Sequence, residues 1–341
     1  MFKHSKVILF IWLIIVMFSS SVDNSSLDAT KEDSQTSPKK QGKVFVMYAA
    51  SLLKTFENDL GPAFQKETGY TYQGEGRGAI QISNMIVDGQ RTPDIFVSAG
   101  TVPIMKLMNN TTPMANWLVK FGSAEMVIAY SPNSLFNNDL EKARKGEIPW
   151  YEVLSKEGFN FGRTSPEIDP KGYYMIITAE LANLYYNDSG IKERILGEDR
   201  NTKQIFAEEI LKTILEQSQV DAVAAYKHEA VARGLPYITL PTEINLSDLE
   251  FTDFYRKAFY TSDDSSGSGQ TVFGEPIYFA VTIPETVKNL EGATSFVDFM
   301  LSTKGENLLE KQGLKYIKPA IIQGNAEKMP LSLQNLTEHL P

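Results

Sequence analysis

Hydrophobic and polar residues follow two patterns along this chain: short apolar runs typical of strands, and a four-residue spacing typical of helices. The first apolar run begins at Val44 and ends at Ser51. A helical pattern follows at once, with apolar residues four apart on one face: Leu52, Phe56, Leu60 and Phe64. We expect a strand that leads directly into a helix, with Ser51 as its N-cap and an interruption at Gly61-Pro62.

The start of such a helix is suited to bind an anion. Its first backbone N–H groups have no partner within the helix, and the helix dipole is positive at that end. Ser51 adds a hydroxyl group. A serine that only caps its helix explains the same stretch, and the residues alone leave both interpretations open.

The alternation of strand and helix patterns continues along the chain. It predicts strands at residues 70–73, 93–98, 126–130, 220–226 and 276–283, and helices over 170–186, 206–215 and 294–309. This βαβ order predicts an α/β fold with a doubly wound parallel sheet. The polar segment 131–138 indicates a boundary near the start of a second lobe, and 265–270 is expected to be a flexible turn.

A glycine-rich turn is expected between the second strand and the helix after it. Gly74, Gly76 and Gly78 surround Arg77, and glycines let a backbone approach a ligand closely. The spacing matches neither common nucleotide-binding pattern. Arg77 either binds an anion directly or is a solvated surface arginine.

Two acidic residues stand at the ends or edges of predicted helices. Asp169 immediately precedes the helix that begins at residue 170. Glu208 falls at the edge of the apolar stripe of helix 206–215, whereas Glu209 points away from it. From the residues alone, Asp169 is a helix cap and Glu208 is a solvated edge residue.

Composition excludes several classes of function. The chain has 341 residues, of which 42% are hydrophobic, enough for one large or two medium α/β lobes. Its formal charge of −9, without a basic stripe, argues against a nucleic-acid partner. The lack of cysteine excludes disulfides, thiolate catalysis and a cysteine-anchored lipoprotein. His4, His228 and His339 are not spaced as a metal site or a catalytic triad.

The N-terminal residues have the pattern of a secretory signal. Lys3 and Lys6 precede an apolar run over residues 7–18, and the serines of 19–21 follow it. Cleavage after Ser21 and retention as an uncleaved membrane anchor both fit this pattern. Residues 22–42 are polar and are expected to form a flexible linker. We expect a protein that is secreted or held at the extracellular or periplasmic face of the membrane, and that meets the membrane only through this segment.

Short motifs in a specific order carry a family resemblance. They are Ala49-Ala50-Ser51-Leu52, Ala115-Asn116-Trp117, Asp169-Pro170-x-Gly172-Tyr173, Leu240-Pro-Thr-Glu-Ile-Asn245 and Gly274-x-Pro276-Ile277. Together they resemble the tungstate/molybdate-binding proteins of ABC importers, over about residues 43–325. The resemblance implies a two-lobed periplasmic-binding-protein-like fold of type II that closes by a hinge motion. One lobe would comprise residues 43–125 and 280–341 and the other 126–279, with the ligand in the cleft between them.

The same resemblance implies the ligand-binding residues. Ser51 matches an oxyanion-binding serine, and Asp169 and Glu208 match carboxylates that contact the tungsten or molybdenum of the ligand. Tyr226 lies where relatives carry a pocket tyrosine. The resemblance implies no catalytic residue and no resident cofactor; it implies an ABC transporter permease as partner, and we expect a monomer.

Gly78 is a departure from the family pattern, because many relatives have a second serine there. We expect Arg77 or the backbone N–H groups around Gly78 to replace the missing hydroxyl. A Gly78→Ser substitution is accordingly expected to be tolerated or to improve affinity.

Electrostatics limits the ways in which two carboxylates can lie beside a bound anion. A carboxylate about 4 Å from a dianion is repelled by roughly 8 kcal/mol at an effective dielectric constant near 20. Asp169 and Glu208 therefore fit a ligand whose metal atom they coordinate, or they are protonated and donate hydrogen bonds. Tungstate and molybdate can expand their coordination in this way, whereas sulfate and phosphate cannot.

Two alternative functions remain open. One is a binding protein for sulfate, phosphate or another anion. The other is an acyl-transferring enzyme, since Ser51-Leu-Leu-Lys54 has the Ser-x-x-Lys form and Ser131-Pro-Asn133 the Ser-x-Asn form. No Lys-Thr-Gly motif follows, and a four-residue pattern arises easily by chance. We expect a binding protein rather than an enzyme.

Overall fold

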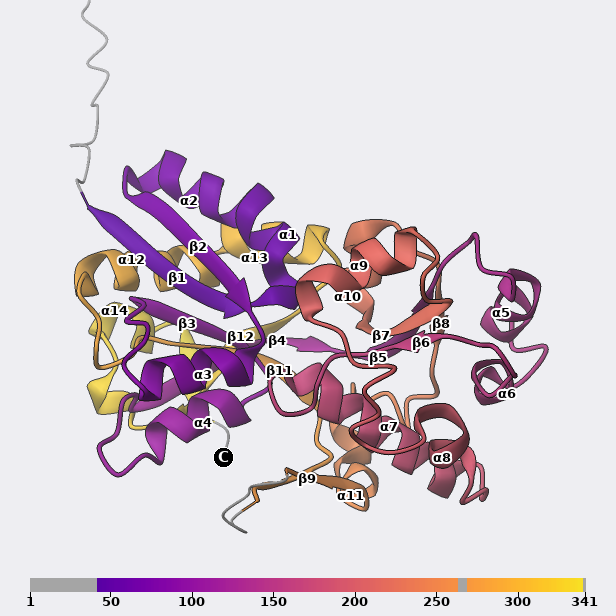
Figure 1. Ribbon diagram of the computed structural model, residues 1–341. Helices are drawn as coiled ribbons and strands as arrows, with labels where there is room; N and C mark the ends of the chain where they lie inside the picture. Colours follow the sequence, from indigo (N-terminus) through magenta and orange to yellow (C-terminus); the bar gives the residue numbers. More distant parts are fainter. Residues whose placement is uncertain (1–41, 263–268, 340–341) are drawn as a thin grey trace, which may run out of the picture. The chain divides into compact units, whose positions relative to one another are not determined.

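Two β-sheets form the framework of the computed structural model, which describes residues 42–262 and 269–339 (Figure 1). The first sheet has seven strands in the order β13-β12-β4-β11-β3-β1-β2. Its strands are β1 Lys43–Ala49, β2 Thr71–Arg77, β3 Ile95–Ala99, β4 Trp117–Ala124, β11 Ile277–Thr282, β12 Lys315–Gly324 and β13 Thr337–His339. The N-terminal signal or anchor, the linker up to residue 41 and most of the predicted turn 265–270 lie outside the described residues.

The second sheet has four strands in the order β6-β7-β5-β8. They are β5 Met126–Tyr130, β6 Phe161–Gly162, β7 Ala222–Tyr226 and β8 Tyr237–Thr239. A separate hairpin pairs β9 Phe259–Thr261 with β10 Thr271–Phe273. Strands of the first sheet thus come from both ends of the described chain, while the middle of the chain forms the second. The division into lobes of 43–125 with 280–341 and of 126–279 stays a prediction.

Helices surround both sheets and connect their strands (Figure 1). They are α1 Leu53–Thr55, α2 Gly61–Thr68, α3 Ala79–Val87, α4 Val102–Met108, α5 Asn137–Arg144, α6 Trp150–Leu154, α7 Pro170–Tyr185, α8 Ile191–Leu196, α9 Glu208–Glu216, α10 Lys227–Arg233, α11 Thr252–Tyr255, α12 Leu290–Leu301, α13 Thr303–Lys311 and α14 Leu331–Gln334. The α/β class predicted from the alternation of patterns is therefore confirmed.

The expectation of a parallel sheet is wrong for part of both sheets, and in the second sheet β5 is antiparallel to β7 and β8. Strands β1, β2 and β3 are parallel, as the βαβ pattern predicts. Strand β11 is antiparallel to both β3 and β4, and β12 is antiparallel to β4. The physical reason is connectivity: the chain returns from the second sheet to reach β11, which enters between β3 and β4 in the opposite direction.

The helical segment after β1 is continuous, contrary to the predicted interruption at Gly61-Pro62. The four apolar residues spaced four apart are all fully buried, as predicted. A π-helical turn, Phe56–Leu60, stands immediately before Gly61. Proline has no N–H to donate, and the wider turn lets the helix pass it without a break. The segment then runs to Thr68 and ends at Gly69, whose φ of +78° places it in the left-handed region.

Two other predicted helices differ from the structure. The helix expected over 294–309 is divided into α12 and α13 at Ser302, whose hydroxyl accepts a hydrogen bond from the Gly305 N–H and so caps α13. Helix α9 begins at Glu208 rather than at residue 206, and Ile210 of the predicted apolar stripe is 46% exposed. The buried face of α9 is therefore rotated toward Glu208.

The two sheets are linked at a narrow crossing of the chain. The Met126 N–H at the start of β5 donates to the Asn245 carbonyl (2.8 Å), and the Ile277 N–H at the start of β11 donates to the Leu246 carbonyl (2.9 Å). Both crossing segments therefore meet the same loop. This places the ends of β1 and β3 from the first sheet opposite elements of the second.

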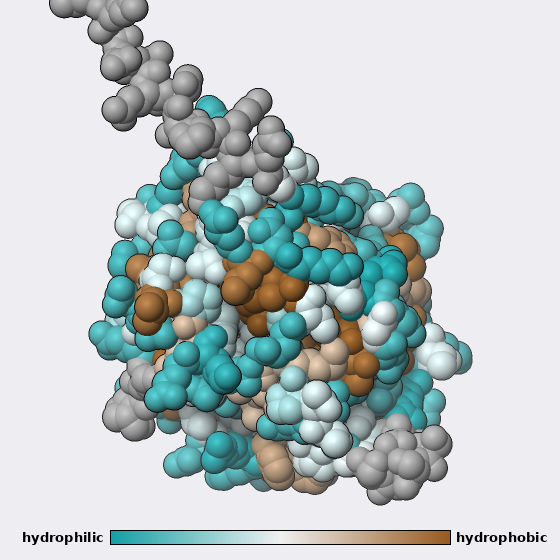
Figure 2. All heavy atoms as spheres, turned by 90° about the vertical axis from the view of Figure 1, so that its left-hand side faces the viewer, coloured by the Kyte–Doolittle hydropathy of each residue, from teal (hydrophilic) through white to brown (hydrophobic). Residues whose placement is uncertain are grey.

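The surface seen in Figure 2 is largely hydrophilic, with small hydrophobic areas between polar residues. Scattered exposed apolar residues are usual for folded proteins. In the described part of the chain, no helix combines the length and apolar character needed to cross a membrane.

Candidate functional site

Ser51 lies where β1 meets its helix, but it is not the N-cap. The chain forms a 3-10 turn, Ala50–Leu52, directly after β1, so Ala49 occupies the N-cap position. The prediction of an N-cap serine is wrong because the helical geometry starts two residues earlier than the pattern indicated. The Ser51 Oγ atom is buried, and it has no hydrogen-bond partner among the described residues. A buried hydroxyl without a partner is unusual and marks a position that a ligand can satisfy.

The glycine-rich segment is a strand rather than a turn. Gly74 and Gly76 lie within β2, which pairs with β1 along its whole length. Both pack on the ring of Tyr48, since a Cβ atom added to either glycine would come within 2.9 Å of that ring. These glycines are explained by packing. Only Gly78 stands at a helix start, as the N-cap of α3.

Arg77 is the last residue of β2, and its side chain is 41% exposed. Its Nε atom lies 3.1 Å from Oε1 of Glu75, two residues earlier on the same strand. The predicted ligand-binding role of Arg77 stays a prediction, and the structure gives its charge a different partner.

Gly78 touches the loop that carries Asp169. A Cβ atom added to Gly78 would lie 2.3 Å from the carbonyl oxygen of Ile168, and Gln81 of α3 donates its N–H to the same oxygen (3.1 Å). The predicted tolerance of Gly78→Ser is therefore wrong for this conformation, because a serine would collide with backbone. Glycine at this position allows the first turn of α3 to contact the second lobe.

Asp169 is the N-cap of α7, as the sequence predicts. Its Oδ1 atom accepts a hydrogen bond from the Lys171 backbone N–H (2.8 Å), and the residue is only 7% exposed. Pro170 occupies the first helical position. Proline suits this position because the N–H that it lacks would have no partner within the helix. The structure thus supports the cap, which was one of the two interpretations of Asp169.

A buried group of charges lies behind Asp169, and we call Asp169, Lys171, Glu208 and Glu229 the acidic cluster. The Lys171 Nζ atom is 2.6 Å from Oε2 of Glu208 and 3.0 and 3.1 Å from the two carboxylate oxygens of Glu229. All four side chains are buried. Glu208 is therefore not the solvated edge residue of the simpler interpretation.

The acidic cluster shifts the pKa of each of its members. Burial raises the pKa of Asp169 to about 6, although the charge of Lys171 opposes this shift. Burial likewise holds the pKa of Glu208 well above its usual value. Burial acts to raise the pKa of Glu229, but the charges of Lys171 and Arg233, with smaller contributions from other neighbours, together lower it to about 2. Lys171 is the reverse case, because the charges of Glu208 and Glu229 overcome burial and raise its pKa. The cluster therefore contains a firm Lys171–Glu229 ion pair beside two carboxyl groups that hold protons more tightly than usual.

Tyr226 connects the acidic cluster to the cleft. It ends β7, and its backbone N–H donates to Oε2 of Glu229 (2.9 Å). Its ring packs on Phe279 of β11 at a centroid distance of 5.9 Å. Burial holds the pKa of Tyr226 well above its usual value, so that its hydroxyl remains a donor. In the described part of the chain this hydroxyl has no hydrogen-bond partner.

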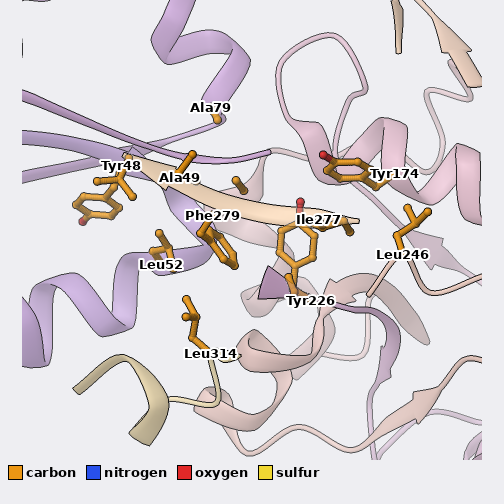
Figure 3. Packing of buried hydrophobic residues seen from close by; sticks show 14 of the residues in the cluster. Tyr48, Ala49, Leu52, Ala79, Tyr174, Tyr226, Leu246, Ile277, Phe279 and Leu314 are labelled. Atoms are coloured by element: carbon orange, nitrogen blue, oxygen red, sulfur yellow. The ribbon is translucent and has the colours of Figure 1, made fainter. Parts of the chain in front are cut away.

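Further unpartnered hydroxyls come from α7. The hydroxyl groups of Tyr173 and Tyr174 are buried and make no hydrogen bond to the residues described. A Cβ atom added to Gly100, just after β3, would lie within 3.2 Å of both hydroxyls. Figure 3 shows Tyr174 above β11 and Tyr226 below it, with Ala49 and Ala79 farther along the same strand on the side of Tyr174. Hydroxyl groups from both sides thus gather where the two sheets meet.

The 3-10 turn Ala50–Leu52, which precedes α1, also approaches α9, and Cα atoms of the two elements lie within 8 Å of each other. His228 lies nearby, with its ring 5.7 Å from that of Tyr226 between centroids. Burial lowers the pKa of His228 to about 4, against the opposing influences of Glu229 and of the Ser51 backbone. The structure thus brings Ser51, Gly78, Asp169, Glu208 and Tyr226 to one region.

The residues of the Ser-x-x-Lys and Ser-x-Asn patterns do not assemble an acyl-transfer site. The Lys54 ammonium contacts the carbonyl of Ala232 rather than Ser51. Ser131 directly follows β5 of the second sheet, and its Oγ atom lies 3.0 Å from Ser218 Oγ. Ser51 therefore lacks the activating base that nucleophilic catalysis requires among the hydrogen-bond partners described.

Lys171 and Glu229 are site residues that the sequence analysis missed. Lys171 occupies the variable position of the Asp-Pro-x-Gly-Tyr motif, two residues after Asp169. Glu229 follows Tyr226 by three residues, which is the spacing of a capping box, and its side chain accepts the Tyr226 backbone N–H as the glutamate of such a box does. This local signal predicts a cap. It cannot predict that Glu229 also faces a lysine 58 residues away.

Comparison with known proteins identifies the family. The family described as bacterial extracellular solute-binding protein matches residues 44–315, and the chain belongs to it. A solute-binding protein of Petrotoga mobilis is 30% identical over 86% of this chain and 89% of its own length. The molybdate/tungstate-binding protein WtpA of Pyrococcus abyssi is 29% identical over 88% of this chain and 91% of its own length.

Solved structures agree on the fold. The periplasmic molybdate-binding protein of Azotobacter vinelandii matches with a TM-score of 0.54 at 17% identity, over 80% of this chain and 98% of that chain. The sulfate-binding protein SubI of Mycobacterium tuberculosis matches with a TM-score of 0.55 at 14% identity, over 82% of this chain and 88% of that chain. The predicted two-lobed periplasmic-binding-protein-like fold is confirmed.

Proposed function

We propose that this member of the extracellular solute-binding family captures a tetrahedral oxyanion, tungstate or molybdate, and delivers it to the permease of an ABC importer. One observation carries the proposal: buried hydroxyl groups without partners gather between the two sheets, beside helix starts and buried carboxyl groups. An oxyanion needs several hydrogen-bond donors in a site closed to water. The WtpA relatives named for molybdate and tungstate support the same ligand class.

The proposed contacts come from both sides of the cleft. From the first lobe, Ser51 donates its hydroxyl and the first turn of α3 after Gly78 offers backbone N–H groups. From the second lobe, Tyr226 donates its hydroxyl, and Asp169 and Glu208 approach the metal atom of the ligand. Arg77 would contribute only by leaving Glu75.

The carboxylates favour tungstate and molybdate over other tetrahedral anions. An ionised carboxylate beside a dianion is repelled unless it coordinates the central atom or donates a hydrogen bond as an acid. The raised pKa values of Asp169 and Glu208 fit both cases, since each reflects a charge that is costly without a ligand. Coordination is open to tungsten and molybdenum but not to sulfur or phosphorus.

A second candidate ligand is an anion of the sulfate class. It is favoured by the position of Lys171, whose ammonium offsets part of the negative charge of Glu208. With that charge offset, a tetrahedral anion could bind through donors alone.

Isothermal titration calorimetry of the protein with tungstate, molybdate, sulfate and phosphate tests the proposal. We expect tungstate and molybdate to bind at least tenfold more tightly than sulfate and phosphate. Stronger binding of sulfate would favour the second candidate. No binding of any of the four anions would overturn the oxyanion function.

The location of the protein follows from its family and its N-terminal sequence. Extracellular solute-binding proteins act in the periplasm or outside the cell. We propose that residues 1–21 direct export and that 22–42 link the protein to the membrane when the signal is not cleaved. The lack of cysteine rules out attachment through a lipid-modified cysteine in this sequence. Fractionation with N-terminal sequencing tests this, and a cytoplasmic protein that begins at Met1 would contradict it. We further propose that the protein is a monomer.

A further inference from the structure

Lys171 has surroundings that are unusual for a lysine. Its side chain is 2% exposed, although lysine is almost never fully buried unless it is paired. Two acidic side chains, Glu208 and Glu229, share its single positive charge. The acidic cluster therefore holds three carboxyl groups and one ammonium group before any ligand is bound.

The two partners of Lys171 are held differently. Glu229 accepts hydrogen bonds from Lys171 through both oxygens, and its Oε2 also accepts the Tyr226 N–H. Glu208 lies 2.6 Å from the Lys171 ammonium, yet neither of its oxygens has hydrogen-bond geometry to any described residue. Glu229 thus fixes the position of Lys171, while Glu208 contacts its ammonium as an ion-pair partner. A second anion can compete for that charge.

We propose that Lys171, anchored by Glu229, is the cationic specificity-determining residue of the oxyanion site. The inference rests on the proposed function and deepens it. The lysine offsets the repulsion between an incoming dianion and the carboxylates of Asp169 and Glu208. It thereby sets how strongly the site depends on metal coordination, and so how far sulfate is disfavoured relative to tungstate.

Charge placement explains why Lys171 suits this role better than Arg77. Arg77 is 41% exposed, where solvent and salt screen its charge. The Lys171 ammonium is buried beside Glu208 and near the Tyr226 ring, 5.6 Å from its centroid. A buried charge acts on a ligand through a lower effective dielectric constant and is therefore felt more strongly.

The test compares two variants. Glu229→Gln keeps an oxygen for the Tyr226 N–H and removes the competitor for Lys171. Lys171→Met with Glu229→Gln removes this ion pair as a unit, so that Glu229 is not left as an unpaired buried charge. Lys212→Met is the matched control: Lys212 lies on α9 as Glu208 does, is 43% exposed and pairs with Glu216.

Calorimetry with tungstate and with sulfate gives the readout, and thermal unfolding without ligand verifies that each variant is folded. We expect Glu229→Gln to bind both anions more tightly than the wild type. The double variant should bind tungstate about 10- to 100-fold more weakly than Glu229→Gln, the range of a hydrogen bond to a charged group. Sulfate should lose more than tungstate, because sulfate has no coordination to replace the lost charge. Lys212→Met should change both affinities less than twofold.

Several results would overturn the inference. Equal affinities of the double variant and Glu229→Gln would make Lys171 a mere counterion of Glu229. If Lys212→Met lost as much anion affinity as the double variant, the effect would come from the overall charge of the protein and not from the position of Lys171. If the double variant does not fold, Glu229→Gln alone tests the inference. Anion binding by Glu229→Gln that is unchanged or weaker than that of the wild type would contradict a role for Lys171. If the wild type and Glu229→Gln bind neither anion, the proposed function itself fails.

Discussion

The two sides of the site are built from different chemistry. On the first-lobe side, Ser51 and the helix start at Gly78 offer a hydroxyl and backbone N–H groups without any charge, and we call this the neutral face. On the second-lobe side, Asp169, Lys171 and Glu208 are buried and charged or chargeable, and we call this the charged face. Donors of the neutral face can bind the oxygens of any tetrahedral anion. The charged face responds to the central atom and to the total charge of the anion.

The two faces also differ in the free energy that their burial costs the folded protein. Buried ionisable groups cost free energy that their mutual attraction repays only in part. Hydroxyl and N–H groups cost less, although each still loses hydrogen bonds to water. We infer that the neutral face supplies affinity at low cost, while the charged face is retained for discrimination between anions.

The largest effect is expected when the charged face loses its two carboxylates. Asp169→Asn with Glu208→Gln keeps the shape of both side chains but removes their negative charge and leaves each with one neutral amide oxygen, a weaker ligand for tungsten or molybdenum. Each change should weaken tungstate binding by about 1.5–3 kcal/mol, the range for charged hydrogen-bonded contacts. Sulfate binding should hold or strengthen, because repulsion has been removed. Calorimetry at fixed pH measures both, and wild-type affinity for tungstate in the double variant would contradict metal coordination.

The next effect concerns the stability of the ligand-free protein and its dependence on pH. Because burial raises the pKa of Asp169 from 3.8 to about 6, the folded protein holds this proton more tightly than the unfolded chain. The contribution of Asp169 is therefore fully present below about pH 4 and is lost as the pH rises through 6. Asp169→Asn should gain stability relative to the wild type over this range, by up to about 3 kcal/mol at 1.36 kcal/mol per pKa unit.

Urea unfolding from pH 4 to pH 7 measures this difference. Other groups that titrate in the range, such as His228, cancel when the variant and the wild type are compared at each pH. A difference in the free energy of unfolding that does not change with pH would contradict the assignment to Asp169.

Gly78→Ser tests the contact between the two faces. The added side chain meets the Ile168 carbonyl, and overpacking of this kind typically costs 1–3 kcal/mol. We expect a loss of about 10- to 100-fold in affinity for both tungstate and sulfate, because closure is disfavoured whatever the ligand. Gly190→Ser is the control, since its Cβ would approach the side-chain ends of Arg194 and Asp188 rather than any backbone atom. Unchanged affinity in Gly78→Ser would show that the bound state differs from this conformation.

Ser51→Ala removes a donor from the neutral face and should have a smaller effect. We expect a loss of about 1 kcal/mol for tungstate and for sulfate alike, the typical contribution of one neutral hydrogen bond. Equal losses for the two anions would support the division between the faces. A loss confined to one anion would show that the neutral face also discriminates.

Arg77→Ala is expected to have the smallest effect, less than about threefold in affinity. Its guanidinium is half-exposed and paired with Glu75, and exposed ion pairs typically contribute 0–1 kcal/mol. Calorimetry in low and high salt tests this. A loss beyond tenfold would show that Arg77 turns toward the ligand.

The sequence predicted the neutral face better than the charged face. Apolar spacing predicted the strand and helix around Ser51, because burial of an apolar face repeats every three to four residues in a helix. Local rules predicted Asp169 as a cap, since a cap depends only on neighbouring backbone groups. The resemblance to the tungstate/molybdate-binding family pointed to Glu208 and Tyr226, which the residues alone did not distinguish.

The structure decided whatever depends on contacts between distant segments. The ion pairs of Lys171 join α7 to α9 and α10, and no local pattern encodes such a meeting. The collision that forbids a side chain at Gly78 comes from Ile168, 90 residues away in the other lobe. The sequence by itself determined the class of fold and the helix starts that can bind an anion, because these follow from local periodicity and backbone hydrogen bonding. Tertiary structure alone decided which charges are buried together, because burial and charge pairing are properties of the packed chain.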